Sequence, residues 1–170
     1  MGIITISNII YLQMIEQIYT YFTIEMIYYW VNLGVLPFWF ILIFFPQSHL
    51  SRYFVTSIFP ILLLSISYVF LFYKSFLNSY DFIGNFNLYL GIGDLSNLFA
   101  DNSFLMMFWV HFISINLFVG GWIVKDSQKF LINKILLSIP LIITYLIGPV
   151  GLMVYWVIRI FYAKRLSLYD

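Results

Sequence analysis

The sequence predicts an all-α integral membrane protein, a four-transmembrane-helix bundle preceded by an amphipathic helix at the membrane surface. Hydrophobic residues make up 63% of its 170 residues and charged residues only 9%, and the mean hydropathy is +0.97. Because a soluble domain carries about 25% charged residues, this chain cannot keep a solvated surface around its core. The few charges also divide the sequence into long apolar segments. Both observations place the chain in a bilayer.

Four charge-free segments are long enough to cross a membrane. They lie between Glu25 and Arg52, between Arg52 and Lys74, between Asp101 and Lys125, and between Lys134 and Arg159. A helix of about 20 apolar residues spans the hydrocarbon core. We therefore expect membrane-spanning helices over residues 26–45, 54–73, 104–124 and 136–158, within a membrane domain of residues 25–162.

The two ends of the chain differ from this domain. Residues 1–24 are expected to form an amphipathic helix in the membrane interface, because their polar side chains recur at helical spacing. These side chains are Gln13, Glu16, Gln17 and Thr20. No Lys or Arg precedes the apolar run, which argues against a signal peptide. Residues 163–170 form a basic tail.

The orientation in the membrane is not determined by the sequence. With four spans, both termini and the 74–103 loop share one side, and each side holds four Lys or Arg residues. The positive-inside rule is therefore tied, and only the Lys164-Arg165 pair favours a cytoplasmic C-terminus.

Composition excludes several classes of function. The net charge of +1 argues against a nucleic-acid partner, and the absence of cysteine excludes disulfides, Fe–S clusters and thiolate zinc sites. No lysine lies within a predicted span, which excludes a retinal Schiff base. Of the two histidines, one lies in a loop, so the spans do not supply the two ligands that a bis-His haem needs. We expect no metal and no cofactor. The bias toward residues of A+T-rich codons looks bacterial, which suggests the bacterial inner membrane.

His111 is the best candidate for a reactive group. An ionisable residue within a span suggests function, and imidazole can act as a general acid or base near neutrality. The alternative is a neutral histidine that hydrogen-bonds a neighbouring helix. Ser114 shares its helix face, whereas Asn116, five residues on, points about 140° away.

Other polar and small residues suggest either a cleft or helix packing. Asn32 and Glu25 share a helix face. Either both line a polar cleft, or Asn32 hydrogen-bonds to a neighbouring helix while Glu25 lies among the lipid head groups. Pro149 breaks the predicted fourth span, where Gly148, Gly151 and Tyr155 share a face. That face either packs closely on another helix or holds a ligand.

These candidates combine into one hypothesis. We expect a lipid-accessible cleft lined by Asn32, His111, Ser114, Gly148 and Tyr155, with Asn116 and Gly151 as further ligand-binding candidates. Arg159 lies outside this hypothesis, because a long basic side chain near the end of a span is expected to reach into the head groups.

Several segments together are similar to a known family. They are Asn32-Leu33-Gly34-Val35-Leu36-Pro37-Phe38-Trp39 ending at Pro46, Asp94-Leu95-Ser96-Asn97-Leu98-Phe99, Trp109-Val110-His111, Asn116-Leu117-Phe118-Val119-Gly120, Asp126 and Gly148-Pro149-Val150-Gly151. In this order and spacing, over about residues 26–162, they resemble the abscisic-acid-deficient-four-like family, whose plant members are needed to make neoxanthin from violaxanthin. The resemblance implies a four-helix membrane protein that acts on or near carotenoids, with His111 matching the histidine of the family.

One position departs from the family pattern. Asn116 stands where the resemblance implies an aspartate, which removes a carboxylate from the membrane interior. We expect a small membrane protein that modifies or handles a carotenoid or another isoprenoid lipid, if as an enzyme then by isomerase-like acid–base chemistry. The alternative is a non-catalytic protein that binds or assembles a pigment, a lipid or a partner enzyme. Its expected partners are the lipid bilayer, such a lipid, and a membrane protein or a second copy of the chain.

Overall fold

The structure is a computed structural model that describes residues 21–164 together with residues 10, 13–14 and 17. The predicted interfacial helix over residues 1–24 lies almost wholly outside the described residues, as does most of the predicted tail over residues 163–170. The elements are α2 (Ile24–Phe44), η1 (Ser51–Val55), α3 (Phe59–Leu77), η2 (Gly84–Tyr89), α4 (Ile92–Phe99), α5 (Asn102–Lys129), α6 (Lys134–Leu146) and α7 (Gly148–Ala163).

Three of these helices are long and apolar enough to cross a membrane. They are α2, α3 and α5, with 21, 19 and 28 residues. They cover most of the predicted spans 26–45, 54–73 and 104–124. The helix α3 begins later than predicted because Pro60 lies in its first turn, where its missing N–H breaks no helical hydrogen bond. Residues 51–55 form the separate π-helical turn η1.

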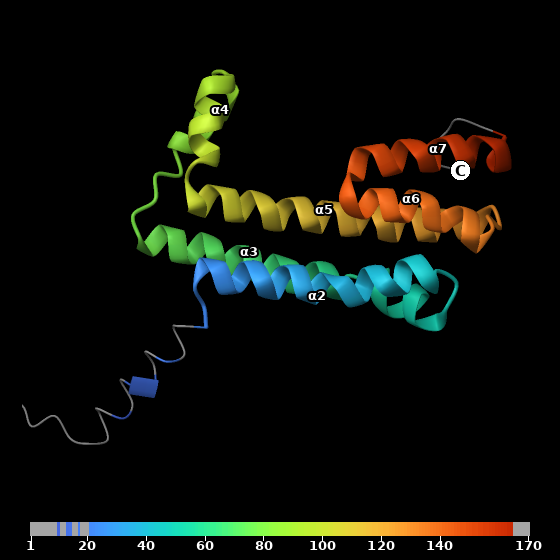
Figure 1. Ribbon diagram of the computed structural model, residues 1–170, viewed down its shortest axis with the longest axis horizontal. Coiled ribbons are helices and arrows are strands. Elements are labelled where there is room, and N and C mark those ends of the chain that lie inside the picture. The colour runs from blue at the N-terminus through green and yellow to red at the C-terminus, as the bar shows by residue number, and fades with distance from the viewer. Residues whose placement is uncertain (1–9, 11–12, 15–16, 18–20, 165–170) are drawn as a thin grey trace, which may run out of the picture.

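The predicted fourth span over residues 136–158 is not one helix. It is divided at Ile147 into α6 and α7, which have 13 and 16 residues and are shorter than the roughly 20 residues that a span requires. Ile147 has a non-helical backbone, with φ −141° and ψ 84°, and the two helices run antiparallel to each other as a hairpin (Figure 1). The chain therefore reverses direction at Gly148-Pro149. The prediction had placed these two residues at a break within one continuous span.

The hairpin tip lies halfway along α5. Gly148 packs so closely on Asn116, in the middle of α5, that an added Cβ would overlap the Asn116 Oδ1 atom. From this tip α7 returns to the end of the bundle where α5 ends, so Ala163 lies at the opposite end from Ile24 (Figure 1). This arrangement contradicts the expectation that the C-terminal end shares a side with the 74–103 loop.

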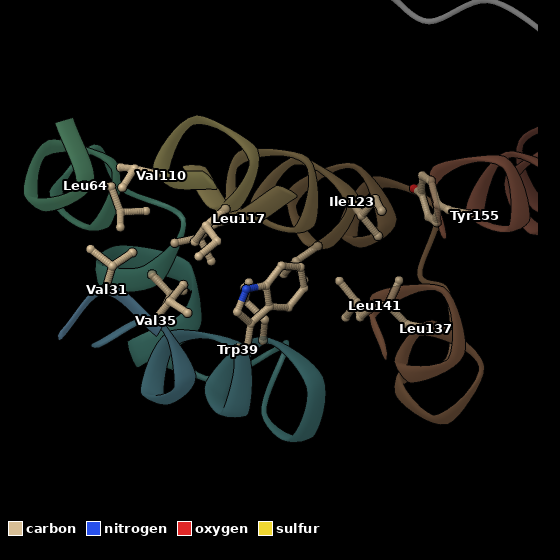
Figure 2. Packing of buried hydrophobic residues seen from close by; sticks show 14 of the residues in the cluster. Val31, Val35, Trp39, Leu64, Val110, Leu117, Ile123, Leu137, Leu141 and Tyr155 are labelled. Carbon is tan, nitrogen blue, oxygen red and sulfur yellow. The ribbon is translucent and has the colours of Figure 1, made fainter. Parts of the chain in front are cut away.

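The core is organised around α5, which contacts α2, α3, α4, α6 and α7. Val31, Val35 and Trp39 project from α2 toward α5, near Leu117 (Figure 2). The Trp39 ring lies against Gly120, where an added Cβ would come within 2.7 Å of the indole. Tight packing of this kind fixes α2 against α5 and leaves the opposite face of α2 to meet α3 and the lipid.

Candidate functional site

The structure does not assemble the cleft expected around His111. The imidazole is exposed on α5 and lines a pocket of about 190 Å³ with residues of α3 and of the 82–85 region. Its neighbours in this pocket include Tyr68, Phe72 and Asn85. His111 therefore faces the predicted second span, although the hypothesis placed it toward the first or the fourth.

Asn32 bonds between helices. Its amide nitrogen donates to the Tyr28 carbonyl oxygen at 2.7 Å, and the Trp109 indole N–H donates to its amide oxygen at 3.3 Å. Asn32 thus links α2 to α5, which is the interhelical alternative that the sequence left open. Ser114 donates to the Val110 carbonyl oxygen at 2.7 Å, within its own helix.

The glycines of α7 lie where the hairpin packs most closely. Gly148 contacts Asn116, and an added Cβ at Gly151 would overlap both the backbone and the side chain of Thr144. The structure therefore brings together Asn116 and Gly148 as close packing partners. Asn116 is only 5% exposed, and its amide nitrogen has no hydrogen-bond partner among the described residues.

Tyr155 belongs to a buried polar cluster that the sequence hypothesis did not contain. The Arg159 Nε donates to the Asp126 Oδ2 at 2.6 Å, and the Tyr155 hydroxyl donates to the same oxygen at 2.7 Å. Arg159 and Tyr155 are fully buried and Asp126 is 3% exposed. Arg159 does not reach the head groups as expected, because Asp126 on α5 supplies an opposite charge inside the protein.

Two aromatic rings also lie close to the Arg159 guanidinium. Its central carbon lies 4.8 Å from the Phe130 ring centroid and 5.0 Å from that of Trp156, distances at which a cation is attracted by the ring. The Lys129 Nζ, on a half-exposed side chain, approaches the second Asp126 oxygen at 3.9 Å. The cluster joins α5 to α7 and holds the hairpin in place.

His111 and this cluster are separate. Position 111 precedes position 126 by fifteen residues of α5, which corresponds to about 22 Å along the helix. One small ligand cannot contact both the imidazole and Tyr155. The set proposed from the sequence therefore divides into three places: Asn32 at Trp109, His111 at α3, and Asn116 with Gly148, Gly151 and Tyr155 along the hairpin.

A larger pocket than that of His111 lies elsewhere, between α2 and α3. It has a volume of about 520 Å³ and includes Trp30, Gly34 and Phe38 of α2 and Leu63, Ser67 and Phe70 of α3. Among the residues that the structure describes, no charged side chain lines it. Gly34 opens it further, because an added Cβ there would meet no atom within 4 Å. One signal in the sequence could have indicated this groove. Gly34 lies within a long apolar helix, where a glycine costs about 1 kcal/mol of helix stability relative to alanine.

A metal site is not formed by the part of the chain that the structure describes, where no three His, Cys, Asp or Glu residues are grouped to hold an ion. Polar groups that could take part in chemistry include, among the described residues, the imidazole of His111, the phenol of Tyr68 and the buried cluster around Asp126. The groove between α2 and α3 offers apolar contact surface to a ligand.

Comparison with known proteins gives one match. A family model described as ABA DEFICIENT 4-like matches residues 26–155, which include most of the groove lining, His111, Asp126 and Tyr155 and end before Arg159. No curated protein and no solved structure matches the chain.

Proposed function

Since the chain belongs to the ABA DEFICIENT 4-like family, we propose that it binds a carotenoid or another isoprenoid lipid in the groove between α2 and α3. The family match relates the protein to neoxanthin synthesis. The apolar groove supports the proposal that a lipid of this kind binds between α2 and α3. Three apolar helices long enough to span a membrane support a membrane protein. We propose the inner membrane of a bacterium as its location.

The single observation that carries the proposal is the lining of the groove. It runs along α2 from Ile27 to Phe38, eleven positions or about 16 Å, which matches an extended stretch of isoprenoid chain. Aromatic rings of Trp30, Phe38 and Phe70 offer flat contact surface to a conjugated chain. Gly34 lets that chain approach the α2 backbone closely.

The selectivity of the groove for one lipid over another must come from its shape, because removal from water does not distinguish them. Lipid tails are as apolar as the groove, so an apolar ligand gains no hydrophobic free energy by leaving the bilayer for it. A rigid polyene loses less conformational freedom on binding than a flexible acyl chain, and preorganisation of this kind favours affinity. A narrow aromatic groove therefore favours a rigid isoprenoid over the surrounding lipid.

The experiment fills the groove from inside. The Gly34→Leu variant places a side chain in the cavity without a backbone clash, and Gly93→Leu on α4 is the matched control, since an added Cβ there also meets no atom within 4 Å. Each protein is expressed in a bacterial host that makes β-carotene, then purified, and the bound pigment is quantified by absorbance and mass spectrometry.

We expect Gly34→Leu to retain severalfold less pigment than the wild type and Gly93→Leu to retain the same amount. Equal pigment in both variants, or pigment absent from the wild type and replaced by ordinary phospholipid, contradicts the proposal. Both variants remove a helical glycine, so a general effect on helix stability affects the two proteins alike.

Conversion of the lipid is a second candidate function, supported by the exposed His111 imidazole in its own pocket beside Tyr68 and Asn85. An acid–base isomerisation needs a proton donor and acceptor within reach of the substrate, and these groups supply the required types. The His111→Ala variant separates the two functions. We expect His111→Ala to keep the bound pigment. If this variant no longer forms a converted product on incubation while its pigment binding is unchanged, catalysis is assigned to His111.

A further inference from the structure

A smaller pocket lies at the other side of α2, where its first turns meet the start of α5. It has a volume of about 270 Å³. Its polar and aromatic lining consists of the Glu25 carboxylate, the Asn102 amide and the rings of Tyr28, Tyr29 and Trp109. Three electron-rich rings and a carboxylate around one space form the kind of site that recognises an organic cation.

The rings are arranged as adjoining walls. The Tyr28 and Tyr29 centroids are 5.7 Å apart with an interplanar angle of 73°, and the Tyr28 and Trp109 centroids are 6.2 Å apart with an angle of 34°. A cation is attracted when it lies within about 6 Å of a ring centroid, so one cation can contact more than one of these rings. The Trp109 indole is held in place by its hydrogen bond to Asn32.

The carboxylate supplies the negative charge of the pocket. Glu25 precedes Tyr28 and Tyr29 by three and four residues, which places all three on neighbouring positions of one helix face. Lys74, the nearby basic residue on α3, donates to the Phe22 carbonyl oxygen at 2.6 Å. Among the described residues no Lys or Arg forms an ion pair with Glu25.

The pocket lies at the membrane boundary. The first turn of α2, the last turn of α3 and the first turn of α5 meet at one end of the bundle, where Glu25, Lys74 and Asp101 are located (Figure 1). Charged side chains at the ends of spanning helices lie at the level of the lipid head groups. We propose that this pocket binds the alkylammonium group of a phospholipid head group, as in phosphatidylethanolamine.

The test uses the full chain in vesicles that contain equal amounts of phosphatidylethanolamine and phosphatidylglycerol. The protein is extracted with a mild detergent, and the retained phospholipids are quantified by native mass spectrometry. Tyr29→Leu removes one wall and Glu25→Gln removes the charge. Tyr73→Leu is the matched control, because Tyr73 is 58% exposed and Tyr29 is 59% exposed, and Tyr73 lies on α3 outside the pocket.

We expect the wild type to retain phosphatidylethanolamine in preference to phosphatidylglycerol. Each pocket variant should reduce that preference about two- to fivefold, the loss expected for one partly exposed cation–π or charge contact. The control should leave it unchanged. Equal retention of the two lipids by the wild type, or the same reduction in Tyr73→Leu, overturns the proposal.

A second arm distinguishes the source of the cation. Free phosphoethanolamine is added to wild-type protein that carries bound phosphatidylethanolamine. No displacement identifies the bilayer lipid as the ligand. Displacement at low concentration identifies a soluble alkylammonium compound as the ligand and overturns the assignment to a lipid head group. In that case the rings and the carboxylate of the pocket bind the soluble cation.

Discussion

The buried ion pair between α5 and α7 makes a strong prediction about Asp126→Asn. This change keeps the shape of the side chain and its hydrogen bond with the Tyr155 hydroxyl, and it removes the negative charge at 2.6 Å from the Arg159 Nε. Arg159 is 0% exposed, so water cannot replace the lost carboxylate. Removing one partner of a buried pair typically costs about 3–5 kcal/mol.

The surroundings of Arg159 place the expected loss at the lower end of that range. The Phe130 and Trp156 rings lie within 5.0 Å of the guanidinium carbon and continue to attract it after the change. Lys129 contributes little, because its side chain is 51% exposed and its distance to Asp126 is 3.9 Å. We therefore expect Asp126→Asn to lower the free energy of unfolding by about 3 kcal/mol.

The measurement is SDS unfolding of the detergent-solubilised protein, followed by circular dichroism. Asp94→Asn on the exposed first turn of α4 is the control, and it should change the free energy by no more than about 0.5 kcal/mol. A double-mutant cycle with Arg159→Met isolates the pair, and Asp126→Asn should cost at least about 1 kcal/mol less in that background. Additive effects, or an unchanged midpoint for Asp126→Asn, would refute the reasoning.

The remaining predictions concern two glycines and the membrane topology. Gly148→Ala should lower the free energy of unfolding by about 1–3 kcal/mol, because its Cβ overlaps Asn116, whereas Gly34→Ala should raise it by up to about 1 kcal/mol. Cysteines placed at Ser79 and Lys164 in this cysteine-free chain should be labelled by an impermeant maleimide from opposite faces of the membrane, with Ser79→Cys labelled from outside. Labelling of both from one face contradicts the hairpin.

The orientation in that prediction follows from the corrected topology. The end of the bundle near η1 and the α5–α6 connection carries Arg52, Lys125, Lys129, Lys134 and Lys164, and the other end carries Lys74. The positive-inside rule was tied when four spans were assumed. With α7 returning to the α5–α6 end, the rule predicts that this end faces the cytoplasm.

Three spans could be predicted from the sequence because charged residues mark their ends. The fourth could not, because a charge-free run between Lys134 and Arg159 gives the length of an apolar segment and not its direction. Gly148 and Pro149 are equally compatible with a kink and with a reversal. Close packing of Gly148 on Asn116 and of Gly151 on Thr144 selects the reversal, and these contacts exist only in three dimensions.

The candidate site was harder to predict for a similar reason. Arg159 lies 33 residues from Asp126, and no local spacing relates them. Helical spacing correctly places His111 and Ser114 on one face of α5. It does not indicate which neighbouring helix that face contacts. A comparison of the two faces of α5 contained a useful signal, since Val110, Leu117 and Gly120 are buried and the bulkier Phe108 and Phe118 flank His111 on the exposed side.

The hairpin tip also has an electrostatic consequence. The carbonyl end of α6 carries a partial negative charge and the amide end of α7 a partial positive charge, each of about half an elementary charge, and one residue, Ile147, separates them. In antiparallel helices these two dipoles oppose each other, so their fields cancel a short distance from the tip. A tip at mid-depth in the bundle therefore needs no counter-ion, and the neutral amide of Asn116 beside Gly148 is sufficient to accompany it.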